Sequence, residues 1–544
     1  MSATSTSPLP RLIPSGTATL LEVDGAPFLI RGGELGNSSA ERAFLSPYWP
    51  KFQAMGLNAI VAPIYWDVVE PVEGQFDWTM VDELLEDARA HGMRLVPLWF
   101  GSWKNSMSCY VPGWVKADHE RFPRSRTSTG APLEILTAFS AVNRAADARA
   151  FAALMTHLRA VDPRHTVVMV QVENEIGQIP EPRDHTPEAR AAFEGPVPTQ
   201  LLDYLASPAS DIAGPHTPTG TPVATLRQCW LAAGARSAGT WTEVFGDSFQ
   251  TEEIFQAWAF ATYVQEVTAA GRAEKDLPMY TNAALIRPGA QPGQYPAAGP
   301  LPHLAEVWRL GAPALDFIAP DIYFPNFADW ADAYVESGNP LFVPEALRSI
   351  DAAANCLYAF GRHAALGFSP FGIESVEGHA QHMITGAYDL IDQLTPLITA
   401  HAGDGTMLGL LPPAPELRYP HRLRLADVVL EASFERVPAP ALADGVINET
   451  GQAAGTEQLP AAAIVIRTGQ DELVVAGIGV TLTFHDTVPG RDVIGLLSVE
   501  EGRYVDGEWQ RLRWLNGDQT HQGRHVRLEP GRFTVQRVKL YRYR

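Results

Sequence analysis

The stretch Thr166-Val-Val-Met-Val-Gln-Val-Glu-Asn-Glu-Ile-Gly177 decides how the rest of the chain is interpreted. It opens with an apolar, β-branched run, which predicts a strand buried on both faces. The run then ends in Glu173, Asn174 and Glu175, and burying a carboxylate without a partner costs several kcal/mol. In parallel α/β folds the reacting groups lie at the carboxyl ends of the strands. We therefore interpret this stretch as the floor of an active site.

A repeated unit of helix, glycine and strand surrounds this stretch. Leu45–Met55 and Val81–Ala90 have helical periodicity, and each is followed by a glycine and an apolar strand. Strands are expected to end near Glu34, Ile64, Phe100, Glu173, Asn282, Tyr323, Glu345 and Glu374. Eight parallel strands separated mostly by helices predict a (β/α)8 TIM barrel over residues 27–400. Residues 181–250 interrupt the pattern, start with a stretch rich in Pro, Gly and Thr, and are expected to be an insertion that forms a lid or pocket wall.

The two ends of the chain have different patterns. Residues 1–26 are expected to form an N-terminal segment, in which Asp24-Gly25 predicts the turn of a hairpin. Residues 401–420 contain a proline-rich stretch and are expected to be a linker. Residues 421–544 are strand-like, with clean alternation at Val480–Phe484, which predicts a C-terminal β-sandwich domain. The expected fold class is α/β, a TIM barrel followed by an all-β sandwich-like domain.

Composition limits the classes of partner. The 544 residues carry a formal net charge of −21, which argues against binding nucleic acid. The three cysteines are far apart in the sequence, which fits a reducing compartment better than a disulfide framework. Because no signal peptide or membrane-spanning segment is visible, we expect a cytoplasmic protein that does not bind membranes. The oligomeric state is left open, with a homodimer as one option.

Two carboxylates at strand ends are the candidate catalysts. Glu175 follows the fourth predicted strand and Glu345 ends the seventh, so a barrel would place both at one pocket. Retaining glycoside hydrolysis needs such a pair, about 5–5.5 Å apart, with one acid/base and one nucleophile. Tyr323, one strand earlier, is expected to donate its hydroxyl proton to Glu345. Asn174 is expected to hold a sugar hydroxyl.

The same residues carry a resemblance to a known family. Gly56-Leu-Asn-Ala-Ile60, Trp66 through Glu70-Pro71 and Val170-Gln-Val-Glu-Asn-Glu-Ile-Gly177 resemble the family 35 β-galactosidases of clan A, in a bacterial branch with a small C-terminal β domain. The resemblance implies a retaining exo-β-galactosidase that needs no cofactor and cleaves terminal galactose from small carbohydrates. It assigns the acid/base role to Glu175 and the nucleophile role to Glu345.

One segment departs from that family. Where the family carries a Cys-Ala-Glu or Asn-Ala-Glu segment that binds galactose hydroxyls, this chain has Trp103-Lys104-Asn105. Tyr65 and Trp103 are candidates for stacking on sugar rings, although barrel aromatics more often serve packing. Glu374, after the eighth strand, is equally compatible with substrate contact and with structural pairing.

Three alternatives remain open. The altered Trp103-Lys104-Asn105 segment favours, as the nearest rival, a retaining clan A glycosidase with another sugar preference. A carbohydrate-binding protein without catalysis is a further alternative. A metal-dependent barrel hydrolase would need a His-x-His after the first strand, where Gly32-Gly33-Glu34 stands, and His379 with His382 lack a third ligand. We therefore expect no metal.

Overall fold

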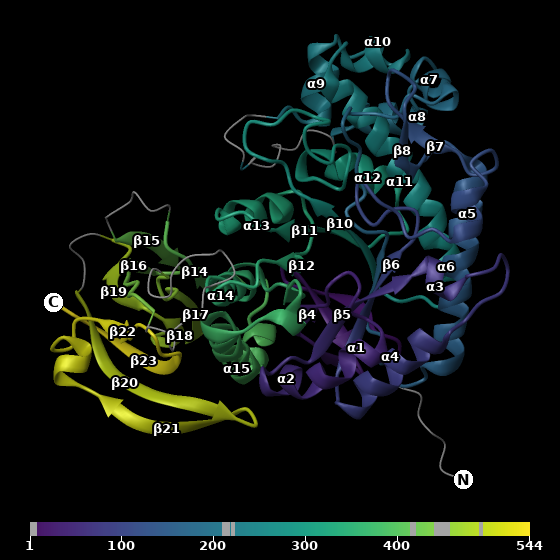
Figure 1. Cartoon of the computed structure of the whole chain (residues 1–544). Helices are drawn as coiled ribbons and strands as arrows, with labels where there is room; N and C mark the ends of the chain where they lie inside the picture. The colour runs from purple at the N-terminus through teal and green to yellow at the C-terminus, as the bar shows by residue number, and fades with distance from the viewer. Residues whose placement is uncertain (1–7, 209–217, 219–222, 414–419, 440–456, 489–492) are drawn as a thin grey trace.

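A computed structural model describes residues 8–208, 218, 223–413, 420–439, 457–488 and 493–544 (Figure 1). Its centre is a closed barrel of eight strands, and every pair of neighbouring strands is parallel. This confirms the predicted fold class, and each of the eight predicted strands takes a place in the barrel. The strands are β4 (Ile30–Glu34), β5 (Ala59–Tyr65), β6 (Arg94–Phe100), β9 (Val170–Val172), β10 (Met279–Ala284), β11 (Phe317–Ile322), β12 (Phe342–Ala346) and β13 (Gly367–Pro370).

Helices surround the barrel. The long ones are α4 (Thr79–Ala90), which was predicted over Val81–Ala90, and α6 (Ala141–Val161), α11 (Phe249–Glu274) and α15 (Gly378–Ala400). Shorter ones are α12 (Ala305–Gly311), α13 (Phe327–Glu336) and α14 (Ala352–His363). The single helix predicted over Leu45–Met55 is instead split into α1 (Arg42–Leu45), η1 (Ser46–Tyr48) and α2 (Trp49–Ala54). The reason is that Pro47 and Pro50 have no backbone N–H to continue a helical ladder.

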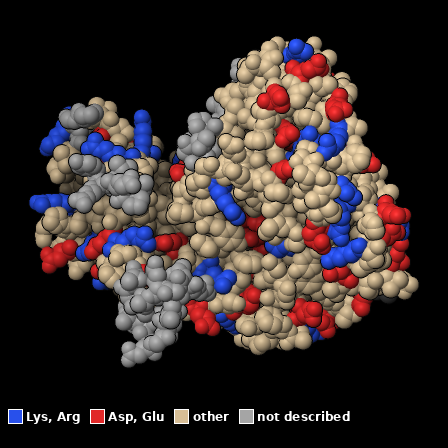
Figure 2. All heavy atoms as spheres, turned by 45° about the horizontal axis from the view of Figure 1, so that its top comes forward, with Lys and Arg blue, Asp and Glu red and all other residues tan. Residues whose placement is uncertain are grey.

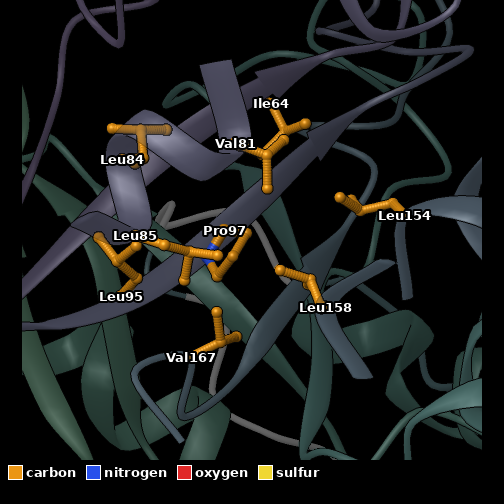
Figure 3. A pocket seen from close by; sticks show the side chains of 10 residues that line it. Ile64, Val81, Leu84, Leu85, Leu95, Pro97, Leu154, Leu158 and Val167 are labelled. Atoms are coloured by element: carbon orange, nitrogen blue, oxygen red, sulfur yellow. The ribbon is translucent and has the colours of Figure 1, made fainter. Parts of the chain in front are cut away.

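The barrel wall is packed tightly against these helices. One small cavity of about 10 Å³ lies between α4, α6 and strands β5 and β6 (Figure 3). Its lining is entirely apolar and includes Ile64, Leu84, Leu95 and Leu154. Because a buried water needs polar partners, this cavity is a packing gap rather than a binding site.

The predicted insertion contains more regular structure than its composition suggested. It includes α7 (Pro187–Phe193), α8 (Thr199–Ala206), α9 (Leu226–Ala232) and α10 (Trp241–Phe245), at the top of Figure 1. Capping boxes start α9 and α10, with Thr225 paired to Gln228 and Thr240 paired to Glu243. These Thr-x-x-Gln and Thr-x-x-Glu patterns were visible in the sequence as helix-start signals. A lid role for the insertion stays a prediction, and part of it, residues 209–217 and 219–222, lies outside the described residues.

Smaller elements complete the N-terminal part and the loops. β1 (Arg11–Ser15), β2 (Ala18–Val23) and β3 (Ala26–Pro27) form a small antiparallel sheet. The hairpin turn predicted at Asp24-Gly25 is confirmed, with φ of 54° and 80° at these residues. The second hairpin strand, β3, is only two residues long, and the first barrel strand begins at Ile30. The loops hold α3 (Trp66–Val69), α5 (Gly113–Ala117), β7 (Arg124–Arg126), β8 (Pro132–Leu136), η3 (Pro302–Leu304) and η4 (Ile373–Ser375).

The C-terminal part forms two antiparallel sheets. The six-stranded sheet has the order β14-β17-β18-β23-β20-β21, and the four-stranded sheet has the order β15-β16-β19-β22. Apolar residues of both sheets share one core, which confirms the predicted sandwich. The strands are β14 (Met407–Leu410), β15 (His421–Leu425), β16 (Val428–Phe434), β17 (Ala462–Gly469), β18 (Glu472–Ile478), β19 (Val480–Asp486), β20 (Val493–Val505), β21 (Glu508–Leu515), β22 (Val526–Leu528) and β23 (Thr534–Tyr543), with η5 (Gly517–Thr520) after β21.

The sandwich packs on the outside of the barrel, beside α14 and α15 (Figure 1). At this contact a Cβ on Gly361 of α14 would lie 2.9 Å from the Cα of Gly409 in β14, so both elements depend on glycine for their close approach. β14 lies within residues 401–420, so the stretch expected to be a linker contains a strand of the sandwich. The other domain limits stay predictions.

Acidic and basic side chains are interspersed over the surface shown in Figure 2. Among the described residues, no helix combines the length and the apolar character that a membrane crossing needs. The cytoplasmic location and the homodimer stay predictions.

Candidate active site

The loop that leaves β9 carries the predicted acid/base. Its backbone takes positive φ at Glu173 (62°) and at Glu175 (40°), a left-handed conformation that non-glycine residues rarely adopt. Such conformations cost about 1–3 kcal/mol each and are typical of functional sites. They also break the strand alternation, so Glu173 and Glu175 do not share a face as they would in a regular strand. Glu175 turns toward β12, and Glu173 turns toward α6.

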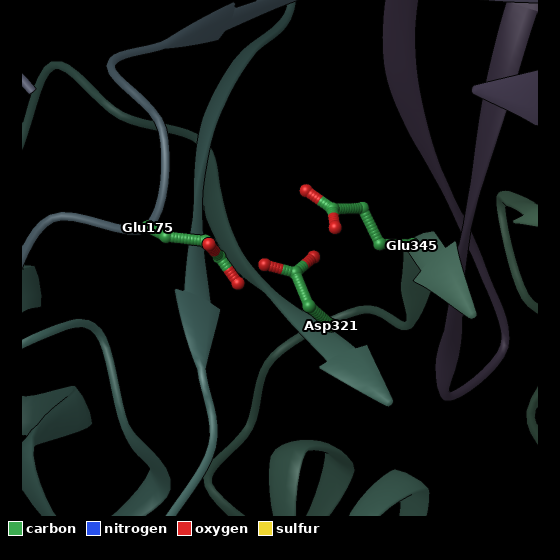
Figure 4. A group of neighbouring side chains, drawn as sticks. All are labelled: Glu175, Asp321 and Glu345. Carbon is green, nitrogen blue, oxygen red and sulfur yellow. The ribbon is translucent and has the colours of Figure 1, made fainter. Parts of the chain in front are cut away.

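Three carboxyl groups meet at the ends of the barrel strands. One oxygen each from Glu175, Asp321 and Glu345 lies within 4.8 Å of the other two. Figure 4 shows the three side chains pointing toward one another from the β9 loop, β11 and β12. Glu175 and Glu345 were expected from the sequence to meet, and the structure brings them together. Asp321 was not expected there.

Glu345 accepts hydrogen bonds from two side chains. The Tyr323 hydroxyl donates to Oε2 at 2.5 Å, as the sequence analysis expected. The Asn282 amide lies 3.4 Å from Oε1 and also donates to Asp321 at 2.8 Å. These donors fix the orientation of the Glu345 carboxyl. Asn282, counted in the sequence only as a strand end, thus acts as a bridge between two carboxyls.

Glu175 has a different environment. Its side chain is 16% exposed, and its backbone N–H donates to the Asn282 side chain at 2.9 Å. Burial raises the pKa of Glu175, the negative charge of Glu345 raises it further, and Lys104 opposes both, which leaves a pKa of about 7. The Lys104 ammonium lies 3.8 Å from Glu175 Oε2. Glu175 can therefore both hold and release a proton near neutral pH.

Two further buried carboxyls complete the cluster. Burial raises the pKa of Glu34 well above its usual range, and Glu345 raises it further. Asp321 shows the same direction from burial and from the charges of Glu345 and Glu175. Within the described part of the chain, no donor group reaches either oxygen of Glu34 or Oδ1 of Asp321. Protonation of Glu34 and Asp321 accounts for oxygens that lack a donor, because a neutral carboxyl can donate its own proton to a neighbouring carboxylate.

The sequence held a signal for both residues. Glu34 closes a predicted strand, and Asp321 interrupts the apolar run Phe317-Ile-Ala-Pro-Asp-Ile322. Their inward direction could not be read from the sequence, because a strand buried on both faces has no alternation. Carboxylates in this number also suit a hard cation. The Lys104 ammonium beside Glu175 already supplies positive charge there, which disfavours a divalent ion.

The Trp103-Lys104-Asn105 segment, which differs from the family pattern, lies directly beside the carboxyl cluster. Lys104 is buried, with its Nζ 5.8 Å from the centre of the Phe100 ring. Burial lowers its pKa, but the charges of Glu345, Glu175, Glu34 and Asp321 together raise it above the usual value. Lys104 is therefore charged and acts as the counter-ion of the carboxyl cluster.

Asn174 and Asn105, also predicted to contact substrate, form hydrogen bonds with other residues of the chain. Asn174 is buried, accepts from Gln171 and Asn282, and donates to the Lys104 carbonyl. The Asn105 side-chain oxygen accepts from Met107 N–H and from the Ser108 hydroxyl, which forms a tight turn. Substrate contacts of Asn174 and Asn105 stay predictions.

Two aromatic candidates are packed into the barrel end. Trp103 is fully buried and meets Tyr263 edge-on, with ring centres 4.8 Å apart. Tyr65 is buried and stacks on Tyr110 at 5.4 Å. These contacts favour packing, and sugar stacking by either residue stays a prediction.

Glu374 ties two loops together. Its carboxyl accepts from the Ser39 hydroxyl at 2.7 Å and from the Gly36 N–H at 3.1 Å. Glu374 is buried. Its contacts therefore favour the structural role over the substrate contact, the two alternatives considered from the sequence.

Two buried acids, Glu173 and Asp147, lie beside the loop that leaves β9 and carries Glu175. Glu173 accepts from the Trp103 N–H at 2.8 Å, and Asp147 accepts from the Trp99 indole at 2.8 Å. Burial raises the pKa of Glu173 well above its usual range, and the neighbouring Asp147 raises it further. Glu173 is therefore a hydrogen-bonded barrel residue.

Comparisons with known proteins point to one clan of enzymes. A family model described as "Beta-galactosidase", that of glycoside hydrolase family 42, matches residues 45–207, a range that includes Glu175 but not Glu345. A second model, a domain of unknown function (DUF5597), matches residues 384–527. A β-galactosidase from Xanthomonas manihotis is 24% identical over 182 residues. That match covers 31% of this chain and only 27% of the length of that enzyme.

Solved structures of low identity share part of the architecture. A β-galactosidase from the psychrophilic Marinomonas ef1 is 12% identical with a TM-score of 0.47, covering 68% of this chain and 60% of that one. A β-galactosidase from Rahnella sp. R3 is 15% identical with a TM-score of 0.45, covering 68% and 57%. The catalytic domain of a β-amylase from Paenibacillus polymyxa is 13% identical with a TM-score of 0.45, covering 65% and 98%. The chain is thus similar to clan A β-galactosidases in part of its sequence, while the matching family model is that of family 42 rather than family 35.

Proposed function

We propose that this protein is a retaining exo-β-galactosidase that hydrolyses terminal β-D-galactosyl residues by double displacement. The observation that carries the proposal is the pair Glu175 and Glu345, whose oxygens lie within 4.8 Å across the barrel end. This spacing is close to the separation of about 5–5.5 Å typical of retaining glycosidases and shorter than the 6.5–9.5 Å of inverting ones. The partial match to β-galactosidases supports the choice of sugar. Membership of family 35 rests on the motif that ends in Glu175.

In the first step, the two carboxyls act on opposite sides of one bond. The Glu175 carboxyl donates its proton to the glycosidic oxygen, and the leaving alcohol departs with that proton. A Glu345 oxygen attacks the anomeric carbon, and a glycosyl ester forms. The hydrogen bonds from Tyr323 and Asn282 hold the Glu345 oxygens in place for this attack.

In the second step, the roles of Glu175 reverse. After proton loss, Glu175 is a carboxylate and takes a proton from the incoming water, whose oxygen attacks the anomeric carbon. The ester bond to Glu345 breaks, and the sugar leaves with its original anomeric configuration. A pKa of about 7 suits a group that must donate in one step and accept in the next. The two steps need only the carboxyls and one water.

The choice of galactose is tested with a panel of p-nitrophenyl glycosides. We expect the β-galactoside to be the best substrate, with the product released as β-galactose before mutarotation, as followed by NMR. Turnover of another glycoside with none of the galactoside would replace galactose by that sugar and leave the retaining mechanism intact.

The catalytic pair is tested with Glu345→Gln, which keeps the shape of the side chain and removes its charge. We expect turnover to fall by ~10⁴-fold or more, with an unchanged melting temperature. Glu188→Gln, on an exposed position of α7, is the matched control and should keep full activity. Full activity in Glu345→Gln would exclude the proposed nucleophile.

A further inference from the structure

The segment that carries Lys104 is bonded to the loop that carries the proposed acid/base. The segment, residues 101–104, follows β6, and the loop leaves β9, the neighbouring strand of the barrel. The Glu173 carboxyl accepts from the Trp103 N–H at 2.8 Å. The Asn174 backbone N–H donates to the Trp103 carbonyl at 3.2 Å, and the Asn174 amide donates to the Lys104 carbonyl at 2.9 Å. Three hydrogen bonds thus connect the two.

Asp147 of α6 holds the same segment. It accepts from the Trp99 indole N–H at 2.8 Å and from the Ser102 backbone N–H at 3.1 Å. The Tyr263 hydroxyl of α11 donates to it at 3.2 Å. The residues around the end of β6 are therefore fixed by a helix as well as by the β9 loop.

Glu173 and Asp147 also meet each other, beside Gly101. A Cβ on Gly101 would lie 2.8 Å from Asp147 Oδ1 and 2.8 Å from Glu173 Oε1. No N–H or hydroxyl donor of the described residues reaches Glu173 Oε1. Burial, and then Asp147, raise the pKa of Glu173 well above its usual range, so Glu173 keeps a proton that it can donate to Asp147. One side chain thus accepts from the segment after β6 and donates to α6.

The backbone of the β9 loop depends on these contacts. Glu173 has a φ of 62°, a conformation that a non-glycine residue keeps only where its surroundings hold it. The contacts with Trp103 and Asp147 provide that hold. Glu175 follows two residues later, with a φ of 40°, so its direction depends on the same contacts.

Lys104 is the charge near Glu175 that this network can move. Glu175 interacts with three carboxyls and one ammonium, those of Glu34, Asp321, Glu345 and Lys104. The three carboxyls come from β4, β11 and β12. Lys104 instead lies on the segment that Glu173 holds, with its Nζ 3.8 Å from Glu175 Oε2. A change at Glu173 is therefore expected to reach Glu175 through Lys104.

We propose that Glu173 is a positioning residue, which holds the Lys104 ammonium against the Glu175 carboxyl. The proposal rests on the acid/base role proposed for Glu175 and adds what keeps that group able to exchange a proton near neutral pH. Lys104 opposes the burial and the negative charge that raise the pKa of Glu175. A Lys104 that moves away therefore leaves the pKa of Glu175 higher.

The test compares Glu173→Met with Glu173→Gln. Methionine keeps the length of the side chain but can neither accept from Trp103 nor donate to Asp147. A glutamine amide can do both, because its carbonyl oxygen accepts and its N–H groups donate, as in a neutral carboxyl. The pH dependence of kcat/KM for p-nitrophenyl β-galactoside is measured for both variants and for the wild type.

We expect the alkaline limb of Glu173→Met to move to higher pH, and that of Glu173→Gln to stay in place. If the two charges separate by a further ~2 Å, about a third of their attraction is lost at a constant dielectric. The limb should therefore move by about half a pH unit, less than after removal of the Lys104 charge itself.

The Lys104→Met background separates positioning from a general loss of structure. There the charge that Glu173 positions is absent, so adding Glu173→Met should move the limb no further. Glu501→Met is the matched control, because Glu501 is also a buried, hydrogen-bonded glutamate but lies in the sandwich. It should lower the melting temperature and leave the limb in place.

An unmoved limb in Glu173→Met would overturn the proposal, as would a limb in Glu173→Gln that moves equally far. An equal movement with and without Lys104 would also overturn it, because Glu173 would then act on Glu175 by another route. If Glu173→Met does not fold, Glu173→Ala takes its place, since the space left by the shorter side chain admits a water to the Trp103 N–H.

A crystal structure of the substituted protein gives a readout that needs no activity. The distance between Lys104 Nζ and Glu175 Oε2 should be longer than 3.8 Å, and an unchanged distance would refute the positioning role. Failure of the wild type to hydrolyse any glycoside would instead refute the proposed function, and this distance would still decide the role of Glu173.

Discussion

Replacing Lys104 by methionine tests the electrostatics of the catalytic cluster. The substitution removes one positive charge and keeps the apolar stem over Phe100. Lys104 opposes the two effects that raise the pKa of Glu175, namely burial and the charge of Glu345. Its removal must therefore raise the pKa of Glu175 above about 7.

The magnitude follows from the distance between the charges. At 3.8 Å and an effective dielectric constant of ~20, two unit charges attract by about 4 kcal/mol, the equivalent of about three pKa units. Both side chains keep some contact with solvent, and the ammonium is shared with Glu345 and two further carboxyls. We therefore expect a shift of about one to two units.

The assay is the pH dependence of kcat/KM for p-nitrophenyl β-galactoside. Its alkaline limb reports loss of the proton from the catalytic acid of the free enzyme, so the limb should move to higher pH by ~1–2 units. Lys539→Met, which removes an exposed lysine of the sandwich, should leave the profile in place. An unshifted alkaline limb, or one shifted to lower pH, would refute the placement of Lys104 beside the acid.

Three further substitutions probe the nucleophile and the support of the loop. Tyr323→Phe removes the donor to Glu345, and since such a bond to a charged group is worth about 1.5–3 kcal/mol, kcat should fall roughly 10- to 100-fold at an unchanged melting temperature. Gly101→Ala would place a Cβ 2.8 Å from carboxylate oxygens of Asp147 and Glu173, so urea unfolding should show a loss of about 1–3 kcal/mol. Glu173→Gln removes a carboxyl whose pKa is raised in the folded state. The free energy of unfolding of the wild type should fall as pH rises above ~4.5, because the unfolded chain then loses the proton that folded Glu173 keeps. The free energy of unfolding of the variant should therefore increase relative to that of the wild type, by up to ~1.4 kcal/mol per pH unit. Urea unfolding of both proteins at pH 5 to 8 measures this difference. A constant difference between the two proteins across that range would show that Glu173 is already ionised.

The barrel was predictable because its signals are local. Each barrel strand is a short apolar run that follows a turn signal, and β6 ends at Phe100, as predicted. Helix α4 shows an apolar stripe and ends at Ala90, two residues before Gly92, so its position was also clear. The insertion was harder, because α7–α10 are short, and their signals are single caps such as Thr225 with Gln228 rather than long periodic stretches.

The candidate site was predictable only in its outline. Glu175 and Glu345 stand out as charges at the ends of apolar strands. The roles of Asn282 and Asp321 depend on which side chains point into the barrel, and a strand buried on both faces does not reveal this. The positive φ at Glu173 and Glu175 likewise has no sequence signal, because it is imposed by the contacts of the loop with Trp103 and Asn282.

The hydrogen-bond donors of the cluster are distributed unequally among its carboxyls. If all four were ionised, Lys104 would leave a net charge of −3 in a buried space, which is too costly to hold. Donors are concentrated on Glu345, which receives the Tyr323 hydroxyl, the Asn282 amide and the proton that a neutral Glu34 can offer. Asp321 accepts from the Asn282 amide alone. No hydrogen bond from the described residues reaches the carboxyl oxygens of Glu175, which has only the ion pair with Lys104. The protein thus places its donors unequally around two chemically identical groups, and this difference fits the roles proposed for Glu345 as nucleophile and Glu175 as acid.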